Sequence, residues 1–145
     1  MRAALALAFV ALAARPAAAC RCSQIGVRAA AKTATQVFVG RIVKETRQKV
    51  DSPECRAHPD WCSFTYAYTF AVESRWKGDV PAEVVIDTGT NTGDCSMGRM
   101  SSKLYVLFAT GTADALRLHM CGGTRPATTA LLAEMTRAFG APKPL

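Results

Sequence analysis

Hydrophobic and polar residues alternate along much of the chain, which is the pattern of a β-strand with one buried face. The longest alternation runs from Phe64 to Trp76, where aromatic and branched side chains occupy most alternate positions. Shorter segments of the same kind predict four more strands, at 36–44, 82–88, 103–109 and 115–120. Clusters of glycine, proline and aspartate separate the five segments and predict turns between them.

A helical spacing of apolar residues is confined to the two ends of this region. It is weak at 25–34 and clearer after Pro126, where four apolar residues fall on one helix face before Gly140 ends it: Leu131, Leu132, Met135 and Phe139. Five strands with a terminal helix predict a mostly β domain, built as a small closed or partly open barrel.

The aromatic row of the longest segment has two interpretations. Phe64, Tyr66, Tyr68 and Phe70 share one strand face, and such a row stacks on bases in some five-stranded barrels. We expect it to fill the barrel interior instead. His119 lies on the polar face of its segment, so we expect it to face solvent rather than act as a ligand or catalyst.

Residues 1–19 are typical of a secretory signal peptide. Arg2 precedes an apolar run at 3–14, and small residues at 17–19 form a cleavage site. The run is too short to cross a bilayer, which takes about 20 residues, and no second apolar segment of that length follows. We therefore expect a single domain at 20–145, exported to the cell exterior or the periplasm, without a transmembrane segment.

Charge adds little to this description. The chain carries a formal net charge of +7, and removal of Arg2 and Arg15 with the leader lowers it to +5. The densest basic group, Arg41 to Lys49, is typical of a solvated strand end. An exported protein with dispersed charge is not expected to bind nucleic acid, whereas an anionic glycan or cell surface is a plausible partner.

All six cysteines lie after the leader, and an even number in a small exported chain predicts a disulfide framework with fifteen formal connectivities. The segment from Cys55 to Cys62 contains His58 and has two interpretations, a local disulfide or a zinc site, but no fourth zinc ligand is near. No paired carboxylates and no nucleophile with a neighbouring base stand out. We expect neither enzymatic activity nor a cofactor.

Several segments together resemble the netrin-type module, and more narrowly bacterial relatives of the amino-terminal domain of tissue inhibitors of metalloproteinases. The resemblance covers 20 to about 140. Its motifs are Cys20-Arg21-Cys22, Val37-Phe38-Val39-Gly40-Arg41-Ile42, Ser74-Arg75-Trp76-Lys77-Gly78, Gly93-Asp94-Cys95, Tyr105-Val106-Leu107-Phe108-Ala109 and Leu118-His119-Met120-Cys121. It implies a five-stranded, OB-like Greek-key barrel, with disulfides from Cys20 to Cys95 and from Cys22 to Cys121. Cys55 and Cys62 are then left as a local pair.

The resemblance also implies a function. In the family, the amine and carbonyl of the first cysteine chelate the catalytic zinc of a metalloendopeptidase, and the next side chain enters its specificity pocket. Here these residues are Cys20 and Arg21. The family usually has Ser or Thr in place of Arg21 and a proline soon after the second cysteine, where this chain has Ser23-Gln24. A charged Arg21 requires an acid in the pocket that receives it.

Two alternatives remain. The domain is a netrin-like binding module for a glycan, envelope or protein partner without inhibitory activity, or it is lipid-anchored at Cys20. The small residues before Cys20 partly resemble a bacterial lipoprotein processing site, although leucine usually stands three positions before the cysteine.

Overall fold

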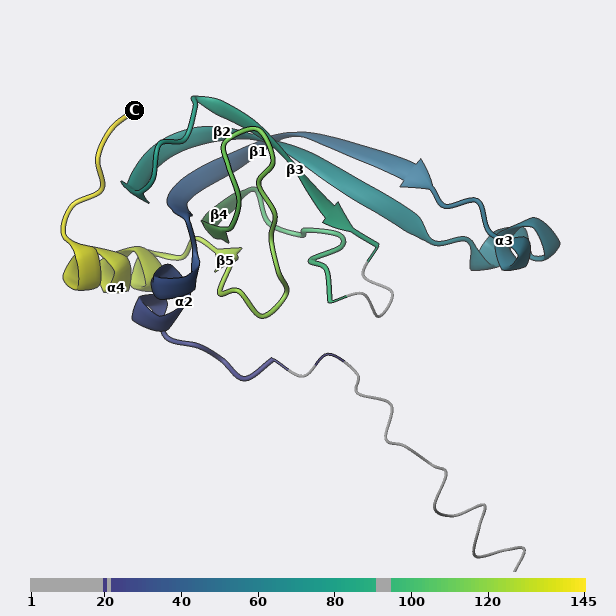
Figure 1. The fold of residues 1–145 in the computed structure, drawn as a ribbon, viewed down its shortest axis with the longest axis horizontal. Helices are drawn as coiled ribbons and strands as arrows, with labels where there is room; N and C mark the ends of the chain where they lie inside the picture. Colours follow the sequence, from purple (N-terminus) through teal and green to yellow (C-terminus); the bar gives the residue numbers. More distant parts are fainter. Residues whose placement is uncertain (1–19, 21, 91–94) are drawn as a thin grey trace, which may run out of the picture.

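The computed structural model describes residues 20, 22–90 and 95–145, and the predicted signal peptide and Arg21 lie outside this part (Figure 1). The described chain is mostly β. Five strands form one antiparallel sheet: β1 (Gln36–Lys49), β2 (Phe64–Lys77), β3 (Glu83–Gly89), β4 (Leu104–Ala109) and β5 (Arg125–Pro126). Helix α2 (Val27–Thr33) precedes the sheet and helix α4 (Thr129–Phe139) follows it. The predicted fold class, a small mostly β domain with disulfides, is confirmed.

The strands lie in the order β3-β2-β1-β4-β5. Three consecutive strands are neighbours, and β4 returns to the free side of β1, which is the Greek-key arrangement. Phe38 of β1 pairs with Arg75 of β2 and with Leu107 of β4. Three irregularities in the β1–β2 register, one of them between Ile42 and Lys44, give these strands extra twist and bend. The body of the sheet therefore curves around one core.

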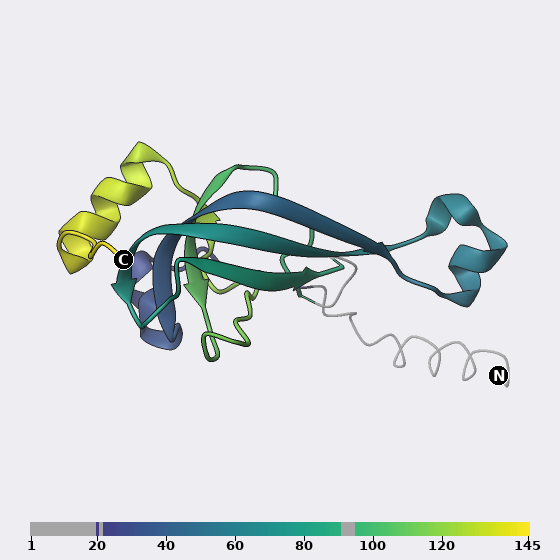
Figure 2. The ribbon, with the colours of Figure 1, turned by 90° about the horizontal axis from the view of Figure 1, so that it is seen from above.

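Strands β1 and β2 continue well past this body as a long two-stranded arm (Figures 1 and 2). A short helix, α3 (Pro53–Ala57), and a 3₁₀ turn, η1 (Pro59–Trp61), close its tip. The disulfide from Cys55 to Cys62 joins α3 to the residue that follows η1. Sequence predicted only the first part of β1, because its outer part is exposed on both faces and carries no hydrophobic alternation.

Apolar residues pack on both faces of the curved sheet. One cluster fills the concave side and includes Phe38, Tyr68, Phe70 and Leu107, all at most 1% exposed. The interior position predicted for the aromatic row is thus confirmed for Tyr68 and Phe70, while Phe64 and Tyr66 are only half-buried. The second cluster lies between α2, α4 and the other face of β1 and β4, with Met135 of α4 at its centre.

The terminal helix has the boundaries expected from its capping residues. The Thr128 hydroxyl accepts a hydrogen bond from the Leu131 amide at 3.2 Å, and Gly140 ends the helix with a positive φ of 81°. Such side-chain caps satisfy amides that the first turn leaves unpaired. Leu131 and Met135 are buried against the sheet, so the helix covers one face of it (Figure 1).

One expectation requires correction, and the choice between a closed and a partly open barrel is decided. The segment 115–120 is not a strand: Leu116 and Leu118 are buried, but its backbone makes only isolated bridges, from Arg117 to Asp87 and to Thr110. The fifth strand is instead the short β5. The sheet is also not a closed barrel, since no ladder joins the edge strands β3 and β5 among the described residues. Apolar and polar residues alternate in 115–120 because Leu116 and Leu118 are buried and the residues between and beside them are not. The segment does not pair into a strand ladder.

Candidate functional site

The segment formed by Cys20 and 22–26 crosses one end of the domain without helix or strand structure, and we call it the amino-terminal segment. Two disulfides attach it to the body, from Cys20 to Cys95 and from Cys22 to Cys121. These are the pairs that the family resemblance implies. Cys20 is half-buried and Cys22 is exposed. Cys20 and Cys22 are thus each held covalently to the body of the domain.

The two loops that receive these disulfides are bonded to each other. The Met120 amide donates a hydrogen bond to the Cys95 carbonyl at 3.0 Å. Cys95 has a φ of 57°, a left-handed conformation that is uncommon for a residue other than glycine. Both disulfides therefore attach to two loops that are hydrogen-bonded to each other, and we call this pair of loops the base of the disulfides.

This base is fixed to the end of β3. The Gly98 amide donates to the Thr88 carbonyl, and the Thr88 hydroxyl lies 2.6 Å from the Gly98 carbonyl oxygen. Thr88 is only 1% exposed. Buried hydrogen bonds of this kind are costly to break, because the freed groups cannot bond to water. These bonds attach the segment that follows Cys95 to the end of β3.

The second loop is a tight turn around His119. The Gly122 amide donates to the His119 carbonyl at 2.8 Å, and the Cys121 amide donates to His119 Nδ1 at 3.1 Å. His119 is exposed, as predicted. Its imidazole nevertheless has a local role, because it orients the backbone of a disulfide cysteine.

Past Cys22, the amino-terminal segment is held by packing and by one arginine. Ile25 packs against the second core cluster, and Arg125 Nη2 donates to the Ile25 carbonyl at 3.4 Å. Gly123 has a φ of 96°, and a Cβ at this position would lie 2.5 Å from the Ala30 Cβ of α2. The turn after Cys121 therefore approaches α2 so closely that it leaves no room for a side chain.

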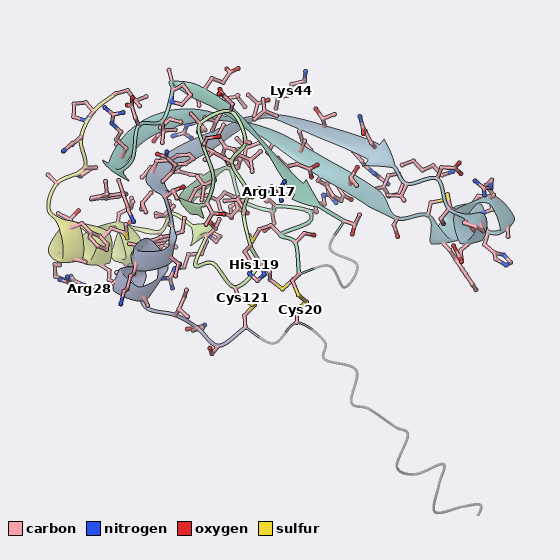
Figure 3. All side chains as sticks on the ribbon, in the orientation of Figure 1. Cys20, Arg28, Lys44, Arg117, His119 and Cys121 are labelled. Atoms are coloured by element: carbon pink, nitrogen blue, oxygen red, sulfur yellow. A yellow bond between two sulfur atoms is a disulfide. The ribbon has the colours of Figure 1, made fainter. Side chains whose placement is uncertain are left out.

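Hollows lie beside the two disulfides. One of about 450 Å³ is lined by Cys95, Asp87, Arg117 and His119 among others, and another of about 210 Å³ is lined by Cys22, Cys121 and Arg125 among others. Figure 3 shows Cys20, Cys121 and His119 at the same end of the molecule, with Arg117 on the same loop. Each of the two hollows therefore has at least one disulfide cysteine in its lining. We call Cys20, Cys22, Cys95 and Cys121 the disulfide ridge.

The structure brings four predicted residues together in the disulfide ridge and places the others elsewhere. Cys55 and Cys62 lie at the tip of the arm, far along the sheet from the ridge (Figure 1). Their disulfide contradicts the alternative of a zinc site there, because zinc binds thiolates. His58 stacks on Trp61 with ring centroids 4.5 Å apart. Nothing in the sequence indicated the bond between the Met120 and Cys95 backbones, which joins loops distant along the chain.

Within 20, 22–90 and 95–145, no three histidine, cysteine, aspartate or glutamate side chains are grouped so that they could hold a metal ion. No helix in the described ranges is long and apolar enough to cross a membrane. Three disulfides are typical of a protein that folds in an oxidising, non-cytoplasmic compartment.

Models of known protein families and curated protein sequences were compared with the chain, and none of them matches it.

Proposed function

We propose that the protein is an exported inhibitor of zinc metalloendopeptidases, related to the netrin-type inhibitors, and that it acts through a new amino terminus at Cys20. Cleavage after Ala19 would give Cys20 a free α-amino group next to its own backbone carbonyl. An amine nitrogen and a carbonyl oxygen so placed can occupy the open position of a catalytic zinc, which keeps only three protein ligands. The inhibitor itself then needs no resident metal.

One observation carries this proposal: Cys20 and Cys22 are both disulfide-bonded to loops that are hydrogen-bonded to each other. A chelating terminus must hold two donors in one geometry, and a flexible terminus would lose that conformational freedom on binding. The disulfide ridge removes most of that freedom before binding. This is the preorganisation that a tight inhibitor requires.

The surroundings of the disulfide ridge are consistent with a protein partner. Two depressions border it, and the exposed side chains of Arg117 and His119 stand on the rim of the larger one. A protease would contact this rim while its zinc is bound at Cys20. Arg21, which we propose as the probe of the specificity pocket, would follow directly, and its charge favours a protease with an acid in that pocket.

Lipid anchoring at Cys20 is incompatible with zinc chelation by Cys20. A thioether-linked lipid needs the same Cys20 sulfur that is bonded to Cys95 in the structure. Acylation would also block the amine. Intact mass of the exported protein separates the two: the inhibitor has the mass of residues 20–145 less six hydrogens, and a lipoprotein carries additional acyl chains.

The decisive experiment is an inhibition assay with the protein beginning at Cys20, against a panel of zinc endopeptidases that includes enzymes with acidic specificity pockets. The matched control begins one residue earlier, at Ala19, and keeps every disulfide and core contact. We expect inhibition by the first and at least a hundredfold weaker inhibition by the second, about 3 kcal/mol, since the added residue removes the amine from the zinc.

Two results would contradict the proposal. Equal potency of the two forms would eliminate chelation by the Cys20 amine. Absence of inhibition across the panel, with correct mass and three intact disulfides, would favour the netrin-like binding module instead.

A further inference from the structure

A third hollow, of about 600 Å³, lies away from the disulfide ridge, where β1 bends and the chain approaches β4. We call it the basic hollow. Its lining comes from two segments, 42–45 and 99–103, together with Tyr68 of β2. In Figure 3, Lys44 of this hollow projects from the opposite side of the molecule to Cys20 and Cys121. Its volume is within the range of small-molecule sites, about 300–1,000 Å³.

Positive charge dominates the lining. Lys44, Arg99 and Lys103 contribute three cations, and Glu45 contributes the single acid. None of the three cations takes part in an ion pair with another described residue, although Arg41, Arg56 and Arg75 elsewhere on the surface do. The hollow therefore has a formal surplus of two positive charges that no described carboxylate neutralises by contact.

Tyr68 is the one aromatic residue in the lining. Its hydroxyl accepts a hydrogen bond from the Met100 amide at 2.9 Å. The Arg99 charge also acts on this hydroxyl and opposes the rise of the Tyr68 pKa that burial causes. Arg99 itself is exposed, as Lys44 and Lys103 are.

The backbone of the wall that carries Lys103 is held in place. The amides of Ser101 and Ser102 both donate to the Tyr105 hydroxyl at 2.9 Å, and the Ile42 amide donates to the Lys103 carbonyl at 2.8 Å. These bonds fix 101–103 to β4 and to the bend of β1. Like charges gathered around one hollow repel one another, and a bound anion would offset that repulsion.

We propose that the basic hollow binds a tetrahedral oxyanion, phosphate or sulfate, either as the free ion or as an ester on a sugar ring. Lys and Arg side chains form strong charge-assisted hydrogen bonds to such oxygens, and Ser101 and Ser102 line the same wall. The volume leaves room for a ring beside the anion. This site is independent of the chelating role of Cys20.

Calorimetric titration of the oxidised protein tests the proposal, with four probes at low ionic strength: inorganic phosphate, inorganic sulfate, a sulfated disaccharide and the same disaccharide without sulfate. The test variant is Lys44→Gln with Lys103→Gln, two exposed positions whose replacement should leave the fold intact. The control variant, Lys32→Gln with Arg137→Gln, removes the same charge from exposed positions of α2 and α4. Thermal unfolding verifies that both variants fold.

We expect at least one anionic probe to bind at one site per chain, the test variant to lose about tenfold or more in affinity, and the control variant to lose less than about threefold. Tighter binding of the sulfated disaccharide than of free ions identifies an ester as the ligand, and equal binding identifies the free ion. Failure of every anionic probe to bind, equal losses in both variants, or equal binding of the unsulfated disaccharide would overturn the proposal. None of these results bears on protease inhibition.

Discussion

At the residue scale, Tyr68 combines burial with a role in positioning a loop. It is 1% exposed, and its hydroxyl accepts a hydrogen bond from the Met100 amide. Burial raises the pKa of Tyr68 above 10.0, because the phenolate would lose its hydration, and the Glu45 carboxylate adds to the rise. The unfolded chain therefore releases this proton at a lower pH than the folded protein does.

The sign of the pH dependence follows from that difference. The stabilisation from Tyr68 is complete below pH of about 10 and is lost as pH rises from there toward the folded-state pKa. We expect Tyr68→Phe to lower the free energy of unfolding by about 1–2 kcal/mol at neutral pH, because the Met100 amide loses its acceptor. We also expect the free energy of unfolding of this variant to decline less steeply with pH above about 10. Urea titrations across this range measure both effects. Tyr66→Phe on the same strand is the control, and an unchanged alkaline decline in Tyr68→Phe would refute this assignment.

Gly123 gives a second prediction at this scale. Its φ is 96°, and a Cβ added there would lie only 2.5 Å from the Ala30 Cβ, so a substitution combines backbone strain with a clash against a helix. We expect Gly123→Ala to lower the free energy of unfolding by about 2–4 kcal/mol. Gly26→Ala is the matched control, since a Cβ there has no heavy atom within 4 Å and the φ is −66°. Similar denaturation midpoints for the two variants would mean that the turn after Cys121 does not press on α2.

At the element scale, the disulfides differ in what they connect. Cys22 to Cys121 spans 99 residues and joins the amino-terminal segment to the loop after 118, whereas Cys55 to Cys62 spans 7 residues within the tip of the arm. Loop closure in the unfolded chain gives about 4.7 kcal/mol for the first and about 2.4 kcal/mol for the second. The tip also adds nothing to either core cluster.

We therefore expect Cys22→Ser with Cys121→Ser to lower the melting temperature severely, and Cys55→Ser with Cys62→Ser to lower it mildly. Circular dichroism during heating measures both, and each variant controls for the other because each removes one disulfide. An equal loss in the two double variants would contradict the assignment of global stability to the disulfide ridge.

At the scale of the whole molecule, the two proposed sites lie on opposite sides of the protein (Figure 3), and only the disulfide ridge depends on the new amino terminus. Zinc accepts the neutral amine, and an unperturbed α-amino group has a pKa of about 7.7–8.0. Inhibition should therefore weaken by up to about tenfold for each pH unit below this range, because binding must release a proton.

Inhibition constants measured between pH of about 6 and about 8.5 test this, with a hydroxamate inhibitor of the same protease as the control for the pH dependence of the enzyme. Acetylation of the amine should abolish inhibition while the fold persists. A pH-independent inhibition constant, together with full potency after acetylation, would leave only occlusion of the protease surface.

Sequence alone determined the kinds of element and most of their places. The alternation from Phe64 to Trp76 lies within β2, and the apolar face ending at Gly140 is α4. These elements can be predicted because the spacing of apolar residues along the chain shows which side chains of one strand or helix share a buried face. The expectation of a disulfide framework also followed from the number of cysteines, which depends on compartment and size rather than on geometry.

Only the tertiary structure decided how these elements meet. Leu116 and Leu118 alternate as strand residues do but bury their side chains without a ladder, while the two residues of β5 pair with β4 and carry no pattern of their own. The arm, the bond from Met120 to Cys95 and the basic hollow likewise arise from residues far apart along the chain. Periodicity records whether a side chain is buried, whereas the partner of a backbone amide or a surface charge is set by which distant segments the fold brings into contact.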